Sequence, residues 1–210
     1  MNKISNIIKI LKKRYPANDF SAHHSTPFKV LVACILSLRT KDETTYPAAK
    51  RLFALADNPE KMLKLQESAI RQTIYPVGFY KRKSKTIKEI CKKLISDYNS
   101  EVPDTIDELL KFRGVGRKTA NIVVTFGYSK PGIAVDTHVH RISNRLGIVK
   151  TKKPEETEFA LKKLVPRKYW IDLNELFVRH GQNTCRPVSP FCSRCEIRKF
   201  CNRVGVATSR

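Results

Sequence analysis

A short glycine-containing run decides the fold of this chain: Leu109-Leu110-Lys111-Phe112-Arg113-Gly114-Val115-Gly116-Arg117-Lys118-Thr119-Ala120. A helical pattern leads into the glycines, and a second helix opens directly after them. The glycines permit a tight turn that exposes backbone N–H groups, and the N-terminus of the second helix adds positive potential on the same side. Such a hairpin can hold a phosphate with the Lys118 amine beside it. Lys118 is therefore a candidate nucleophile, with a phosphate contact or a solvated position as its ordinary alternatives.

Helical signals extend along the chain in both directions from this run. Residues 40–43 and 105–108 both have the T-x-x-E form of a capping box. Convincing period-two strand patterns are missing from the sequence, and turn residues cluster at 129–132. We therefore predict an all-α fold with a boundary at that cluster. Apolar residues at helical spacing predict helices over 120–126, from about Asp136 to Gly147, from Pro154 to Pro166, and over about 169–180.

The composition predicts a globular protein whose working partner is a polyanion. The chain has 210 residues, is 41% hydrophobic, and contains no apolar segment as long as a membrane span. Its N-terminus lacks the features of a signal peptide, so we expect an intracellular, cytoplasmic protein without a membrane partner. Lys and Arg number 41 against 19 Asp and Glu, a net charge of +22. Nucleic acid is the leading partner class, and a ribosome or an anionic membrane surface are the alternatives.

Four of the six cysteines crowd the C-terminus with the spacing C-x6-C-x2-C-x5-C: Cys185, Cys192, Cys195 and Cys201. Disulfides are disfavoured inside cells, so the cluster predicts a metal site. Structural zinc sites ordinarily use two C-x2-C pairs, and only one is present. The spacing favours an iron–sulfur cube with one thiolate per iron, and zinc is the alternative. Cys34 and Cys91 are expected to be small buried hydrophobes.

Three motifs taken together are similar to the endonuclease III family: the run 114–120, the tetrapeptide Val135-Asp136-Thr137-His138, and the four C-terminal cysteines. This is the family of helix–hairpin–helix DNA glycosylases with a [4Fe–4S] loop, and the match follows nearly the whole chain in order. The resemblance implies two helical domains with the active-site cleft between them. One is a six-helix barrel over 21–130 that carries the hairpin. The other joins 1–20 to 131–210 and carries the cluster and Asp136.

The resemblance also implies an activity. The chain would be a bifunctional DNA N-glycosylase and AP lyase. Its substrate would be double-stranded DNA containing damaged pyrimidines or abasic sites, and it would act as a nucleoid-associated monomer. Lys118 would attack C1′ of the deoxyribose, form a Schiff base and cleave 3′ to the lesion by β-elimination. Asp136 would stabilise positive charge or shuttle a proton, and a helix N-cap is its alternative role. Monofunctional relatives usually carry Tyr or Ser at position 118. A purely DNA-binding module, the other alternative, needs neither Lys118 nor Asp136.

Further DNA contacts are implied at weaker positions. Arg39 stands where a glutamine commonly fills the gap left by the flipped base, which leaves the opposite-base preference open. Phe79 matches a wedge position, with a core aromatic as the alternative, and the alternative for His138 is a structural hydrogen bond to the backbone. Arg113 replaces the proline that usually precedes the hairpin. The full set of implied DNA contacts is Gly114, Val115, Gly116, Arg117, Thr119, Ser37, Arg39, Phe79 and His138.

Overall fold

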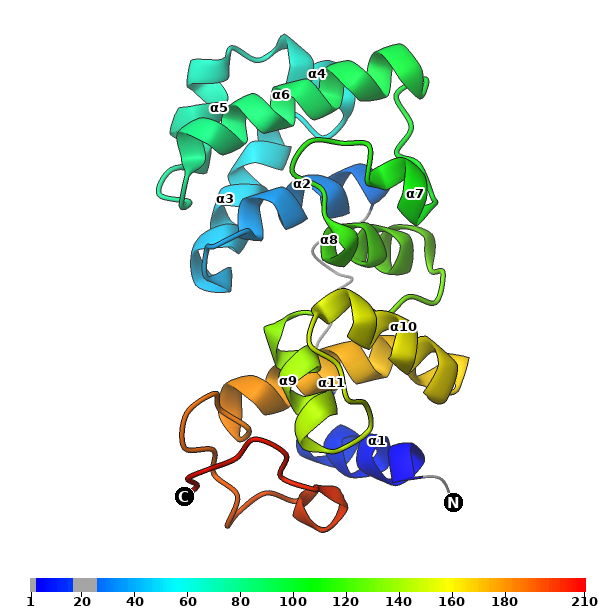
Figure 1. Ribbon diagram of the computed structural model, residues 1–210. Coiled ribbons are helices and arrows are strands. Elements are labelled where there is room, and N and C mark those ends of the chain that lie inside the picture. The colour runs from blue at the N-terminus through cyan, green and yellow to red at the C-terminus, as the bar shows by residue number, and fades with distance from the viewer. Residues whose placement is uncertain (1–2, 17–25) are drawn as a thin grey trace. The chain divides into compact units, whose positions relative to one another are not determined.

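The computed structural model describes residues 3–16 and 26–210, and every regular element in these ranges is a helix (Figure 1). The predicted all-α fold class is confirmed. No helix in the described ranges is both long and apolar enough to cross a membrane. The chain divides into two compact units, Asp19–Lys130 and the combination of Met1–Asn18 with Pro131–Arg210. The division falls inside the turn cluster at 129–132.

The unit Asp19–Lys130 is built around α2, a helix that is apolar on almost every face. Thr26 caps its N-terminus by accepting a hydrogen bond from the backbone N–H of Lys29 at 3.3 Å. α2 packs against α3, α6 and α8, while α4 and α5 pack against α6. The elements are α2 (Pro27–Ser37), α3 (Asp42–Leu55), α4 (Pro59–Lys64), α5 (Glu67–Ile74), α6 (Tyr80–Asp97), α7 (Ile106–Leu109), α8 (Arg117–Ile122) and a π-helical turn (Val123–Gly127).

The second unit is built around α11, against which α1 and α9 pack, while α10 packs against α9. Its core is formed by apolar side chains of these helices, including Ile7, Leu11, Val139, Ile142, Leu173 and Phe177. The helix expected over 169–180 runs one turn further. The elements are α1 (Lys3–Arg14), α9 (Thr137–Arg145), α10 (Pro154–Leu164), α11 (Trp170–Asn183) and short 3₁₀ turns at Arg167–Tyr169 and Arg198–Phe200.

The two predicted capping boxes have different outcomes. Thr105 caps α7 by accepting from the backbone N–H of Glu108 at 3.4 Å. The Glu108 carboxylate binds Tyr98 and Lys111 instead of reaching back, so half of that box forms. The box predicted at 40–43 is wrong. α3 follows Lys41 with no side-chain cap, because the Thr40 hydroxyl is engaged in the preceding loop.

Candidate functional site

The glycine hairpin joins α7 to α8 and depends on one backbone conformation that suits glycine. α7 ends at Leu109, and turns replace the helical pattern expected through Phe112. Gly114 has a φ of +81°, in the left-handed region that favours glycine. Val115 is buried, and its backbone N–H donates to the carbonyl of Phe112 at 3.1 Å. These features fix the hairpin on the core and turn its glycines outward.

The exit of the hairpin places Lys118 in the first turn of α8. Gly116 is the N-cap, and a Cβ built there would meet no atom within 4 Å. Lys118 is exposed, whereas Thr119 is buried against the core. Open space beside backbone N–H groups, with Arg117 and Lys118 adjacent, is an arrangement suited to a phosphate. The sequence-predicted hairpin residues are thus brought together. The side chains of Val115 and Thr119 are buried, so the DNA contacts implied for these two side chains are wrong.

Two residues near the hairpin have partners that the sequence did not indicate. Arg113, at the position of the usual proline, forms an ion pair with Glu89 of α6 at 3.1 Å. Cys34 of α2 is buried, which raises the pKa of its thiol to about 12, and the positive charge of Lys118 opposes that shift. Cys34 and Cys91 are both buried free thiols, as predicted.

The loop after α2 and the start of α6 bring Arg39 and Phe79 together. The Arg39 guanidinium lies over the Phe79 ring, 5.8 Å from its centroid. Both residues have positive φ, +52° and +57°. Phe79 is 59% exposed, so the alternative of a core aromatic is wrong. The Ser37 hydroxyl is bound within its own helix, where it donates to the carbonyl of Cys34 at 2.9 Å.

In the second unit, Asp136 caps α9. One carboxylate oxygen, Oδ1, accepts from the backbone N–H groups of His138 and Val139, both at 2.9 Å. His138 lies against Gly181, where a Cβ would come within 2.4 Å of its Nδ1. The same nitrogen is 3.1 Å from Nη2 of Arg141. The capping role of Asp136 is therefore present, and the ring of His138 has a hydrogen bond with the side chain of Arg141.

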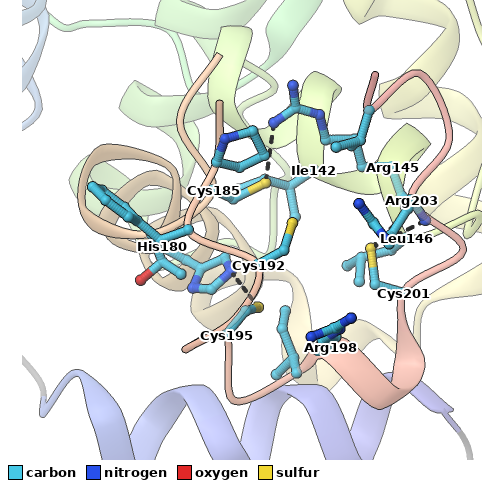
Figure 2. A pocket seen from close by; sticks show the side chains of 15 residues that line it. Ile142, Arg145, Leu146, His180, Cys185, Cys192, Cys195, Arg198, Cys201 and Arg203 are labelled. Carbon is cyan, nitrogen blue, oxygen red and sulfur yellow. Dashed lines mark hydrogen bonds between the residues drawn. The ribbon is translucent and has the colours of Figure 1, made fainter. Parts of the chain in front are cut away.

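The four C-terminal cysteines line one pocket of the second unit, with Ile142, Leu146 and Ile197 among the apolar residues around it. Figure 2 shows the four sulfur atoms at separate positions around this pocket. Among the residues that the structure describes, no three His, Cys, Asp or Glu side chains are grouped to hold a metal ion. A cluster with one thiolate per iron fits four separated sulfurs in a lining that combines apolar side chains with cationic ones such as Arg145 and Arg198.

Side-chain nitrogens from α9 and α11 reach the thiol sulfurs. Nη1 of Arg145 lies 3.4 Å from the sulfur of Cys185, and Nε2 of His180 lies 3.7 Å from that of Cys195 (Figure 2). Burial lowers the pKa of His180 to about 4 and raises that of Cys195 to about 11. Sequence reasoning missed Arg145 and His180. Neither has a motif of its own, and only the packing of their helices directs them to the cysteines.

The cysteine loop also carries a compact group of cations. The guanidinium groups of Arg186, Arg194 and Arg210 lie 5.1, 4.0 and 4.6 Å from the ring centroid of Phe191. The Arg210 backbone N–H donates to the carbonyl of Pro190 at 2.8 Å. Three of the basic residues of this segment thus gather around one aromatic ring, an arrangement that suits contact with an anionic backbone.

Comparisons with known proteins agree with these features. A family model described as HhH-GPD superfamily base excision DNA repair protein matches residues 32–167. Endonuclease III of Thermotoga maritima is 46% identical over 94% of this chain and 92% of that protein. Chloroplastic endonuclease III homolog 2 of Arabidopsis thaliana is 42% identical over 83% of this chain, which spans 47% of that longer protein. A solved structure of a trapped endonuclease III–DNA covalent intermediate, an estranged-adenine complex, matches with a TM-score of 0.87, 34% identity and 97% coverage of both chains.

Proposed function

The chain belongs to the HhH-GPD superfamily of base excision DNA repair proteins and, within it, to the endonuclease III family, and we propose that Lys118 is the nucleophile of its reaction. The protein is a DNA glycosylase and AP lyase. The observation that carries the assignment to Lys118 is its exposed position in the first turn of α8, two residues after the open-sided Gly116. A solved relative that was trapped as a covalent intermediate with DNA supports a covalent route.

Base release begins when the target nucleotide is rotated out of the duplex. The neutral amine of Lys118 attacks C1′ of the deoxyribose, and a bond from Nζ to C1′ forms as the bond from C1′ to the base breaks. The base leaves with the electron pair of that bond and takes up a proton, while Nζ loses one. Opening of the sugar ring then gives a protonated Schiff base between Nζ and C1′.

Strand cleavage follows from the positive charge on that Schiff base. The charge acidifies the protons on C2′, so a proton acceptor can remove one of them. The electrons of the C2′–H bond form a new double bond, and the 3′ phosphate departs with the electrons of its bond to C3′. Water then hydrolyses the Schiff base and regenerates the Lys118 amine. This sequence accounts for both activities with one residue.

We assign Asp136 the electrostatic and proton-transfer part of the reaction. The carboxylate would stabilise the positive charge that develops on the sugar as the base leaves, and it can accept a proton from the attacking amine. The two backbone N–H groups that bind Oδ1 fix the orientation of this carboxylate at the start of α9. Capping and chemistry are therefore compatible roles for Asp136.

DNA would be held mainly through its phosphates. The exposed backbone around Gly114 and Gly116, with the side chain of Arg117, would bind the strand next to the lesion. Arg39 and Phe79 would enter the duplex where the nucleotide has left. The high net charge of +22 supports an interaction of this kind.

Cys185, Cys192, Cys195 and Cys201 would hold a [4Fe–4S] cluster, each ligating one iron. The support is a pocket lined by four thiols, with side-chain nitrogens directed at two of them. The cluster would fasten together a loop that has little regular structure of its own. By holding the loop, the four cysteines and the cluster would also position the cations around Phe191.

Damaged pyrimidines are the proposed bases, with abasic sites as a second substrate. A lysine at position 118 supports the bifunctional reaction over a monofunctional one. We propose that the protein works as a monomer on chromosomal DNA, in the cytoplasm and at the nucleoid.

Borohydride trapping on a duplex containing an abasic site tests this proposal. Reduction of the Schiff base would give a stable protein–DNA adduct with the wild-type protein. Lys118→Gln should give none, whereas Lys111→Gln, a control at an exposed lysine before the same hairpin, should be trapped like the wild type. An adduct of Lys118→Gln at the wild-type level would overturn the assignment.

A further inference from the structure

Lys83 of α6 has an unusual environment for a lysine. Its side chain is only 6% exposed, and its amine donates to the carbonyl of Leu36 at 2.7 Å, to the carbonyl of Leu38 at 2.6 Å and to the Thr40 hydroxyl at 3.0 Å. A protonated lysine has three N–H donors, and each has an acceptor here. All three acceptors belong to the end of α2 and the loop that carries Arg39.

The same lysine is tied to Phe79 through the backbone. The N–H groups of Arg82 and Lys83 both donate to the carbonyl of Phe79, each at 3.0 Å. Phe79 is the N-cap of α6 and has a φ of +57°. The backbone of Lys83 therefore fixes the start of the helix, and its side chain fixes the loop opposite.

Gly78 brings the two segments into close contact from the other side. A Cβ built at Gly78 would lie 2.9 Å from the carbonyl oxygen of Arg39 and 3.2 Å from the Thr40 hydroxyl. The distance to the Arg39 oxygen is shorter than the contacts that real Cβ atoms make, and this oxygen belongs to the backbone. The loop of Arg39 thus rests directly on the chain that leads to Phe79.

Burying an ammonium group among neutral oxygens is costly, and burial lowers the pKa of Lys83 to about 8. An apolar side chain of similar length would avoid this cost. The gain from the lysine is positional, because its bonds hold a loop whose Arg39 backbone has a φ of +52°. Arg39 and Phe79, 5.8 Å apart from guanidinium carbon to ring centroid, are the exposed side chains that this arrangement presents.

We propose that Lys83 is a positioning residue that locks Arg39 and Phe79 into one rigid stacked pair, which enters the DNA duplex as a unit. The proposal rests on the proposed function, in which these two side chains occupy the space left by the flipped nucleotide. A wedge must stay in place against the stacking of the bases it separates. Two side chains on independently mobile loops would be displaced as the bases restack, whereas a pair held by Lys83 would stay in place.

The test compares duplex opening with chemistry on DNA that needs no opening. The substrates are a duplex containing thymine glycol and a single strand containing an abasic site. Lys83→Met removes the three donors while keeping an unbranched side chain. The matched control is Lys88→Met, because Lys88 lies on the same helix and its amine donates to the carbonyls of Leu63 and Leu65 at 2.5 and 2.6 Å.

We expect Lys83→Met to lower base removal from the duplex by about 10- to 100-fold, as a displaced positioning contact does. Its cleavage of the single strand should stay within about twofold of the wild type, and Lys88→Met should resemble the wild type on both substrates. Gly78→Ala, which pushes the Arg39 loop from the opposite side, should reproduce the duplex defect with Lys83 intact. In an Arg39→Ala, Phe79→Ala background, adding Lys83→Met should cost less than about twofold, because the pair is already gone.

An equal loss on both substrates would overturn the proposal, since it would show that Lys83 only supports the fold. Wild-type activity of Lys83→Met on the duplex, or a full additional loss in the double-alanine background, would overturn it as well. A wild-type protein that cleaves neither substrate would instead refute the proposed function, and this inference with it. The single-strand measurement therefore separates the two failures.

Discussion

The guanidinium of Arg145 donates to the sulfur of Cys185 across 3.4 Å, and the same group donates to the carbonyls of Arg186 and Pro187 at 2.6 and 2.7 Å. The carbonyl of Arg145 also accepts from the N–H of Val204 at 3.2 Å. One buried residue on α9 therefore holds the beginning and the end of the cysteine loop.

Arg145→Met is expected to lower the free energy of unfolding by about 1.5–3 kcal/mol, because it removes the charged donor that holds the carbonyls of Arg186 and Pro187. Urea denaturation measures this change. Arg194→Met is the control, since the Arg194 side chain rests on Phe191 at the surface of the same loop. Equal stability of the two variants would show that Arg145 does not organise the loop.

Two substitutions at Asp136 separate its capping role from its chemical role. Asp136→Asn keeps an oxygen that can accept from His138 and Val139, so its stability should stay within about 0.5 kcal/mol of the wild type, whereas Asp136→Ala should lose about 1 kcal/mol. Both remove the negative charge, and both should slow base release by about 100-fold or more. Thermal unfolding and single-turnover glycosylase rates measure the two effects. Full activity of Asp136→Asn would remove the carboxylate from the mechanism.

The hairpin glycines should respond differently to alanine. Gly114→Ala places a side chain at a φ of +81° and should cost about 1 kcal/mol or more of stability. Gly116→Ala meets no neighbouring atom and should fold normally, yet its methyl group would occupy the space proposed for a phosphate. We therefore expect weaker DNA binding from Gly116→Ala at unchanged stability, measured by fluorescence anisotropy and thermal unfolding. Unchanged binding would place the phosphate elsewhere.

Cys34 and Cys91 are expected to resist alkylation in the folded protein. Burial raises the pKa of both thiols to about 12, so the reactive thiolate is scarce at any pH below that value. Iodoacetamide at a pH of about 8 should modify neither residue until denaturant is added. Peptide mass spectrometry reads the outcome, and rapid native labelling of Cys34 would show that the thiol near Lys118 is open to solvent.

Local sequence signals predicted those parts of the molecule that depend on neighbours in the chain. The hairpin glycines, the helix that begins after Asp136 and the cap at Thr105 are all set by backbone conformations that specific residues favour. Thr40 shows the limit of such reasoning. It has the same capping pattern as Thr105, but a buried lysine 43 residues away takes its hydroxyl.

The residues that sequence reasoning missed are those whose task depends on packing between distant segments. Lys83 lies in a basic run that is typical of a solvated helix, and only the approach of the 36–40 loop makes it a buried donor. Arg145 likewise acts on residues 40 or more positions along the chain. Cation side chains of this kind give no periodic signal, because their partners are mostly backbone carbonyls.

The most direct test of the central claim is to identify the residue that becomes joined to DNA. The wild-type protein is trapped with borohydride on a duplex containing an abasic site, digested, and analysed by mass spectrometry for the peptide that carries the sugar remnant. The account predicts a single modified amine, Nζ of Lys118. A remnant on another lysine or on the α-amino group, with Lys118 unmodified, would contradict it.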